Sequence, residues 1–152
     1  MSYQEQRSVL IMAVGVAVFV VYFAVALTRF SALEATVAVD AAVALRFWAR
    51  AMLILVPIAV VANVVAMILF AIFYRICTGE EIPDLEDERD RLIELKVNQV
   101  AQGLFLLGFF ASMVPVAFGG TVAVMFLVIA GAGLVSQLVS ETARIVMYRS
   151  GV

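Results

Sequence analysis

The sequence contains no histidine and a single cysteine, Cys77. Without histidine the chain has no Ser-His or Cys-His catalytic pair and none of the common zinc sites. Charge is also scarce, because 14% of the residues are charged, whereas about a quarter are charged in soluble proteins. The net charge of −2 and the lack of a basic cluster argue against nucleic acid as a direct ligand. We therefore expect no enzyme, no catalytic residue, no metal site and no cofactor.

Uncharged apolar residues are abundant instead. Hydrophobic side chains make up 65% of the chain and fall into long runs without charge. A run of about 20 residues crosses a hydrocarbon core of about 30 Å as an α-helix. The runs predict a single integral membrane domain, residues 1–152, with spans at approximately 8–28, 51–75, 97–118 and 121–143. The expected fold class is an all-α membrane protein, a four-transmembrane-helix bundle with a helical first loop and a charged cytoplasmic helical extension of the third span.

The positions of lysine and arginine predict the orientation. These residues concentrate on the cytoplasmic side of membrane proteins. With the N-terminus inside, seven of the ten lie on the cytoplasmic side, while Arg29, Arg46 and Arg50 lie in the first loop. We predict a multi-pass membrane protein with both termini in the cytoplasm.

The first loop, residues 29–50, is expected to be helical. Ser31 and Glu34 have the spacing of a capping box, which marks the start of a helix. The predicted helix either lies on the outer membrane surface or extends the second span. A ligand site at Glu34 and Asp40 is the weaker alternative, because two acids without further ligands make a poor metal site.

The second span contains Pro57 and Asn63. Proline removes a backbone donor, so we expect a kink before it. An asparagine near the bilayer centre should face inward and find a partner, and Tyr22 of the first span lies at a similar predicted depth. Asn63 is then either a packing contact between helices or part of a solute path.

The stretch 80–96 is the hydrophilic part of the chain. Acidic residues come first and Arg91 and Lys96 follow, an order that suits the helix dipole. We expect a helix from Asp84 that continues into the third span, with Leu92, Leu95 and Gln99 on the side that packs against the bundle. The predicted docking surface consists of Asp87, Glu88, Arg89, Asp90, Arg91, Glu94 and Lys96.

Residues 87–96 also carry a resemblance. They read D-E-R-D-R-L-I-E-L-K, which is similar to a D-E-R-D/E-x-x-I-E-x-K motif before the third span. The motif is that of an uncharacterised family of small four-span prokaryotic membrane proteins, a domain of unknown function. The resemblance implies a protein of the prokaryotic inner (plasma) membrane and a companion of small helix-turn-helix regulators, and it supplies no catalytic residues.

Polar residues recur in the third and fourth spans. Antiparallel pairing about the Gly119-Gly120 turn places Gln102 level with Gln137. The same pairing places Asn98 level with Glu141. The predicted intramembrane polar cluster consists of Asn63, Asn98, Gln102, Gln137, Glu141 and Arg144. It either closes the cytoplasmic end of the hairpin or lines a vestibule for an ion or solute.

The same pairing predicts two further contacts between these spans. Arg144 falls within reach of Glu94. Gly108 and Gly131 fall opposite each other, where small residues would let the two backbones approach closely.

Two functions remain. The favoured one is a non-enzymatic small integral membrane protein, with a regulatory role, that acts through protein–protein contacts and uses residues 80–96 as its cytoplasmic docking surface. Its expected partners are membrane lipid, further copies of the chain in a homo-oligomer, and a cytoplasmic protein. The alternative is a small oligomeric channel or transporter with a polar path along the second and fourth spans, since a chain this small encloses a route only as an assembly.

Overall fold

The computed structural model describes residues 3–36, 38–78 and 88–150, and in these residues the chain forms four long helices. They are α1 (Tyr3–Thr36), α2 (Ala41–Thr78), α3 (Glu88–Ala117) and α4 (Val122–Ser150). Each is long and apolar enough to cross a membrane. The predicted all-α fold of a four-helix, multi-pass membrane protein is confirmed.

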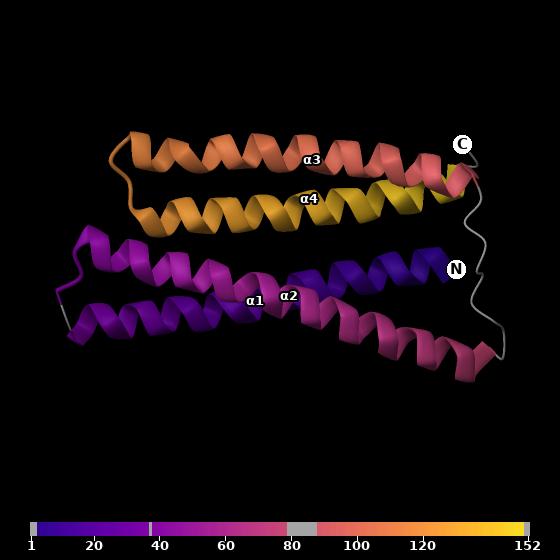
Figure 1. Ribbon diagram of the computed structural model, residues 1–152, viewed down its shortest axis with the longest axis horizontal. Helices are drawn as coiled ribbons and strands as arrows, with labels where there is room; N and C mark the ends of the chain where they lie inside the picture. Colours follow the sequence, from indigo (N-terminus) through magenta and orange to yellow (C-terminus); the bar gives the residue numbers. More distant parts are fainter. Residues whose placement is uncertain (1–2, 37, 79–87, 151–152) are drawn as a thin grey trace.

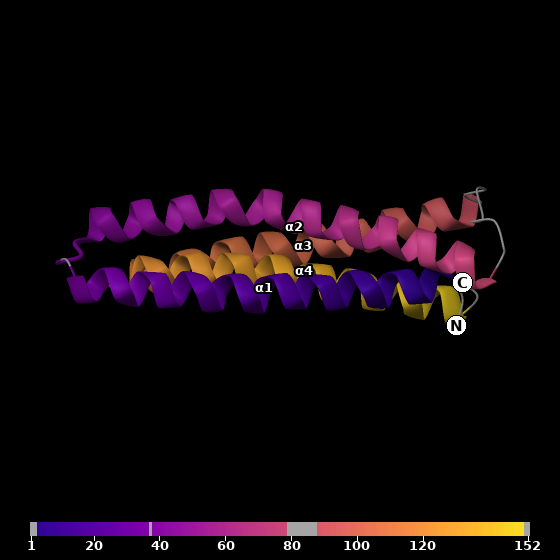
Figure 2. The same cartoon turned by 90° about the horizontal axis from the view of Figure 1, so that it is seen from below.

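The helices form two antiparallel pairs, α1 with α2 and α3 with α4 (Figure 1). α4 packs against each of the other three helices, whereas the backbone of α3 approaches only α4 among the described residues. The loop after α1 and the turn after α3 lie at one end of the molecule, the loop end. The start of α1 and the end of α4 lie at the opposite end, the terminal end (Figures 1 and 2). Among the described residues, the backbone of α3 is therefore held to the rest of the bundle through α4.

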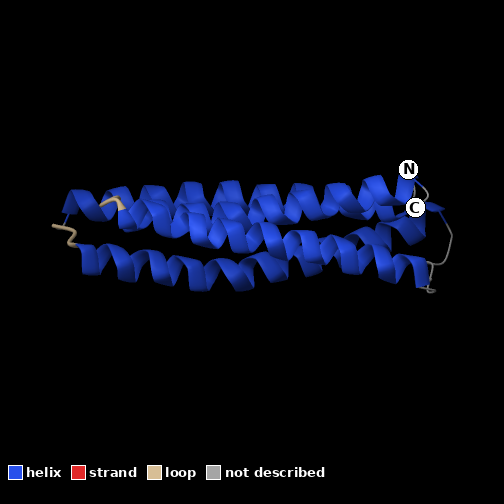
Figure 3. Ribbon diagram, turned by 90° about the horizontal axis from the view of Figure 1, so that it is seen from above, coloured by secondary structure: helices blue, strands red, loops and turns tan. Residues whose placement is uncertain are grey.

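The first loop contains no separate helix. α1 continues through Ser31, whose hydroxyl donates to the Thr28 carbonyl at 3.0 Å. The capping box predicted with Glu34 is therefore wrong, because this serine bonds back into its own helix. α2 begins after Asp40, whose carboxylate accepts a hydrogen bond of 2.7 Å from the Val43 amide, as an N-cap does. The helical part of the loop extends the spans, and among its described residues only 38–40 are not helical (Figure 3).

The turn between α3 and α4 is present where the sequence predicts it. Gly119 has a φ of 79°, a left-handed conformation that favours glycine. Its amide donates to the Val116 carbonyl at 3.2 Å, and the Gly120 amide donates to the Pro115 carbonyl at 2.7 Å. These are the two hydrogen bonds of a Schellman motif, which ends a helix and satisfies its last carbonyls.

α3 and α4 also pack closely at Gly108. A Cβ atom on this glycine would overlap the Cβ of Ala132. Gly131, the predicted neighbour, has no such contact within 4 Å. The close approach exists, but its partner is one residue further along α4, because the rotation of α4 places Ala132 rather than Gly131 at the interface.

α2 continues as a helix through Pro57. Since proline lacks an N–H, one hydrogen bond of the helix is missing there. Figure 2 shows α2 changing direction near its middle, in line with the predicted kink.

Aromatic rings join α1 to α2 at the terminal end. The ring of Tyr3 lies 5.5 Å from that of Phe70 and 4.9 Å from that of Tyr74.

Large apolar side chains are exposed along all four helices. This is the arrangement expected where lipid rather than water surrounds the protein. Near the loop end, Phe23, Ala26 and Trp48 are buried together and form what we call the aromatic cluster. It packs against α4 at Ala123, Phe126 and Ala130 and so ties the α1–α2 pair to the α3–α4 pair.

Candidate functional site

α3 packs against α4 through one side and leaves the opposite side exposed. Ile93 and Val97 mark the buried side, with 4% and 0% of their surface accessible. Leu92 and Leu95, predicted to pack against the bundle, are each 60% exposed. That prediction is wrong because neighbouring positions differ by about 100° around a helix, and the buried stripe begins at Ile93.

We call the exposed side the outer face of α3. It carries two leucines, two cations and three amides: Arg91, Leu92, Leu95, Lys96, Asn98, Gln99 and Gln102. None of the three amide side chains makes a hydrogen bond within the described part of the chain. Gln102 lies six residues beyond Lys96, which is about 9 Å along the helix. The amides therefore extend from the level of the last cation into the apolar span.

The predicted docking surface overlaps the start of this face. Asp87 lies outside the described residues, as do the side chains of residues 88–90, whose backbone forms the first turn of α3. Arg91 and Lys96 are exposed. Glu94 is directed toward α4 and takes part in an ion pair there.

The predicted intramembrane polar cluster is only partly assembled. Asn98 and Gln102 lie on the outer face of α3, away from the α4 side chains expected to meet them. The α4 side chain that reaches α3 at this level is Ser136, whose hydroxyl donates to the Ala101 carbonyl at 2.6 Å. Antiparallel pairing fixes depth in the membrane but not the rotation of α3 about its axis, so the amides were assigned to the wrong side.

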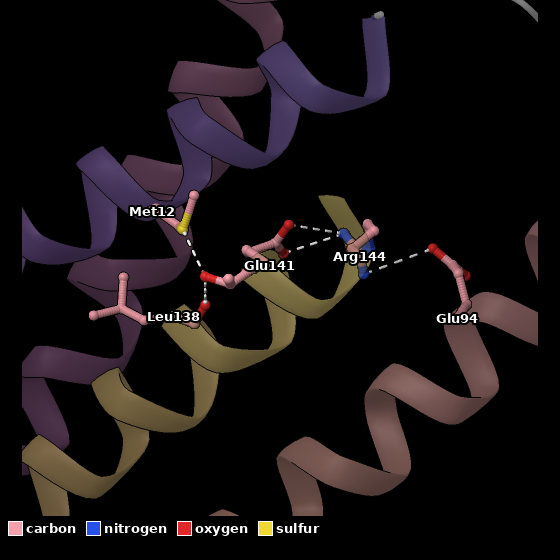
Figure 4. A network of polar contacts seen from close by, with 6 residues as sticks. Met12, Glu94, Leu138, Glu141 and Arg144 are labelled. Atoms are coloured by element: carbon pink, nitrogen blue, oxygen red, sulfur yellow. Dashed lines mark hydrogen bonds and ion pairs between the residues drawn. The ribbon is translucent and has the colours of Figure 1, made fainter. Parts of the chain in front are cut away.

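Arg144 of α4 lies between two carboxylates (Figure 4). Its Nη1 donates to both carboxylate oxygens of Glu141 at 3.1 Å, and its Nη2 is 3.9 Å from Oε1 of Glu94 on α3. The side chains of Arg144 and Glu141 are only 11% and 8% exposed. The predicted contact of Arg144 with Glu94 is confirmed. Because two charges buried in this way have lost much of their hydration, each depends on the other for stability.

A second ion pair joins α1 to α4 at the terminal end. Nε of Arg149 donates to Oε1 of Glu5 at 2.6 Å. About two turns inward, the Thr142 hydroxyl donates to the Leu138 carbonyl at 2.7 Å and lies 3.7 Å from the sulfur of Met12 (Figure 4). The ion pair of Glu5 with Arg149 was not predicted from the sequence, because apolar runs do not indicate which helix lies beside α1. The sequence indicated only that both residues lie at the cytoplasmic end of their predicted spans.

Asn63 and Gln137 line a common cavity of about 400 Å³ between α1, α2 and α4, to which α3 contributes Phe105. Nδ2 of Asn63 donates to the Ala59 carbonyl of its own helix at 2.9 Å. Gln137 lies against α1 at Gly15, where a Cβ atom would come within 2.9 Å of its Oε1. Glu141 and Arg144 do not line this cavity. The α4 members of the predicted polar cluster thus divide into an ion pair near the terminal end, Glu141 with Arg144, and an amide in the interior, Gln137.

The predicted hydrogen bond between Tyr22 and Asn63 is wrong. The Tyr22 hydroxyl donates instead to the Ala51 carbonyl. Antiparallel packing of α1 on α2 places Tyr22 level with Ala51, which is more than three helical turns from Asn63.

Within the described residues, no group of three or more His, Cys, Asp or Glu side chains is placed to hold a metal ion. No family model matches the chain, and no curated protein or solved structure shows significant similarity to it. The resemblance of residues 87–96 to the uncharacterised four-span family stays a prediction.

Proposed function

We propose that this protein is a non-enzymatic integral membrane protein that acts through protein–protein contacts, and that the outer face of α3 is the surface its partners bind. One observation carries the proposal: two leucines and three amides are exposed on the side of α3 that meets no other described helix. The lack of histidine supports the non-enzymatic part, since the common catalytic pairs need it.

The amides within the membrane favour a second copy of the chain as one partner. An amide that faces lipid has no donor or acceptor to replace water, whereas hydrogen bonds between membrane helices contribute about 0.6 kcal/mol each and up to about 2 kcal/mol. The Gln102 amide both donates and accepts. Two copies related by a two-fold axis therefore satisfy each other's amides without any further protein.

The charged part of the face fits a cytoplasmic partner. Arg91 and Lys96 project where α3 leaves the membrane, next to Leu92 and Leu95. Exposed leucines flanked by cations provide an apolar contact with a charged rim, the usual composition of a protein interface. With the terminal end in the cytoplasm of a prokaryotic cell, this surface is open to a soluble regulator.

The proposal predicts that reversing the charge at Arg91 and Lys96 removes the cytoplasmic partner. In a pull-down from membranes, Arg91→Glu with Lys96→Glu should recover at least about tenfold less partner than wild type, because like charges at a rim cost affinity. Folding should be unaffected, since both side chains are exposed and exposed charges add little stability.

The matched control is Arg75→Glu. Arg75 is exposed, carries the same charge and lies in the last turn of α2 at the terminal end. It should retain the partner. Equal recovery from wild type and the Arg91–Lys96 variant would remove the support for docking at this face.

The cavity shared by Asn63 and Gln137 favours one second candidate, a small channel or transporter. On that account Asn63→Leu should abolish flux in reconstituted vesicles, because the amide would lie on the path. The docking account expects no flux from wild type and no effect of Asn63→Leu on partner recovery.

A further inference from the structure

A groove of about 850 Å³ lies between α1 and α2 near the loop end. Apolar side chains from residues 17–33 of α1 and 43–58 of α2 form most of its lining. Three arginines also line it, Arg29 from α1 and Arg46 and Arg50 from α2. All three are exposed, and none has a hydrogen bond or ion pair among the described residues.

Arg29 lies at the level expected for one surface of the membrane. The aromatic cluster packs against α4 at Ala123 and Phe126, close to where that helix begins. Arg29 lies less than one turn beyond the cluster in α1, so it is level with the start of α4 and the turn before it. From Arg29 back to Arg7 the helix rises about 33 Å, which matches a hydrocarbon core of about 30 Å. The Arg29 guanidinium is therefore at the depth of lipid headgroups. Arg46 and Arg50 line the same groove at or below this level, and arginine side chains there extend toward the headgroups.

The length of the groove matches one leaflet. From Arg29 to Ala17 the wall of α1 extends about 18 Å, and half of a hydrocarbon core is about 15 Å. No aspartate or glutamate lines the groove. Of the nearby acids, Asp40 caps α2 through its carboxylate, and Glu34 is exposed outside the lining. The three positive charges are therefore not neutralised from within the groove.

We propose that this groove binds an anionic membrane lipid, with an acyl chain along the apolar wall and the phosphate among Arg29, Arg46 and Arg50. Guanidinium groups bind phosphate through paired, charge-assisted hydrogen bonds. The apolar side chains of the wall would contact the acyl chain in the same way as they contact bulk lipid. A bound lipid also accounts for three arginines on the side of the membrane where the orientation rule expects few positive charges.

Native mass spectrometry of the full chain in detergent tests the proposal. Wild type is titrated with phosphatidylglycerol or phosphatidylcholine of the same acyl chains. Phosphatidylglycerol should bind at least about tenfold more tightly, because only its headgroup has a net negative charge to meet the arginines. Replacing Arg29, Arg46 and Arg50 together with glutamine should abolish this preference, whereas Arg75→Gln at the opposite end should leave it unchanged.

Two further measurements distinguish the binding of a lipid from the binding of a free anion. Ala17→Trp places a large side chain at the inner end of the groove and should weaken phosphatidylglycerol binding without touching the arginines. Inorganic phosphate at the same concentration should not displace the lipid. Equal binding of the two lipids by wild type, displacement by inorganic phosphate, or unchanged preference in the triple variant would each overturn the proposal. If the triple variant does not fold, Arg50→Gln alone replaces it and should reduce the preference.

Discussion

Replacing Arg144 with methionine is expected to lower the free energy of unfolding by about 3 kcal/mol, measured in detergent by chemical denaturation. The substitution leaves the Glu141 carboxylate buried, at 8% exposure of its side chain, without the two hydrogen bonds of 3.1 Å that it now accepts. The loss of a partner from a buried pair costs more than the pair itself contributes, because the remaining charge has neither water nor counter-charge.

A double substitution separates this effect from lost packing. Glu141→Leu together with Arg144→Met removes both charges, so its cost should be smaller than the sum of the two single costs. Arg75→Met is the matched control, because that side chain is exposed, makes no ion pair among the described residues and should leave stability nearly unchanged. Strict additivity of the two buried substitutions would show that Glu141 and Arg144 do not stabilise each other.

Gly108→Ala is expected to be the most damaging small substitution in the α3–α4 hairpin. Its Cβ would overlap the Cβ of Ala132, and both atoms are fixed to helix backbones, so the two helices must move apart. Overpacking of this kind costs about 1–3 kcal/mol, and the loss should appear as a lower thermal midpoint in detergent.

The exchange of the two side chains supplies the internal test. Gly108→Ala combined with Ala132→Gly should restore most of the stability, because the closest remaining atom is the Ala132 Cα at 3.3 Å. Gly103→Ala is the control, since no atom lies within 4 Å of its new Cβ and alanine favours a helix by up to about 1 kcal/mol. A double variant as unstable as Gly108→Ala alone would contradict the close approach.

Features that depend on one segment were predictable from the sequence. Uncharged runs fixed the number of helices, because their length in residues converts directly into distance across a bilayer. The Gly119-Gly120 pair identified the turn, since a left-handed residue is needed to end α3 in a Schellman motif. Antiparallel pairing about that turn then predicted the contact of Arg144 with Glu94.

Features that depend on the rotation of a helix about its own axis, or on which helix packs beside it, were not predictable from the sequence. Leu92 and Ile93 are both apolar, and in lipid the outward side of a helix can be as apolar as the inward side. Periodicity therefore could not show that Ile93 is buried and Leu92 exposed. The same ambiguity placed Gln102 on the wrong side of α3. The contact of Glu5 with Arg149 was missed because no pattern in the sequence tells which helix packs beside α1.

A photo-activated cross-linking residue introduced at Gln102 gives the most direct test of the outer face of α3 as a contact surface. Leu69 is the control position, because it is 61% exposed on α2. After illumination of intact membranes, the account predicts an adduct with the mass of two chains from position 102 and none from position 69. Cross-links from position 69 alone, or none from either position, would contradict the account.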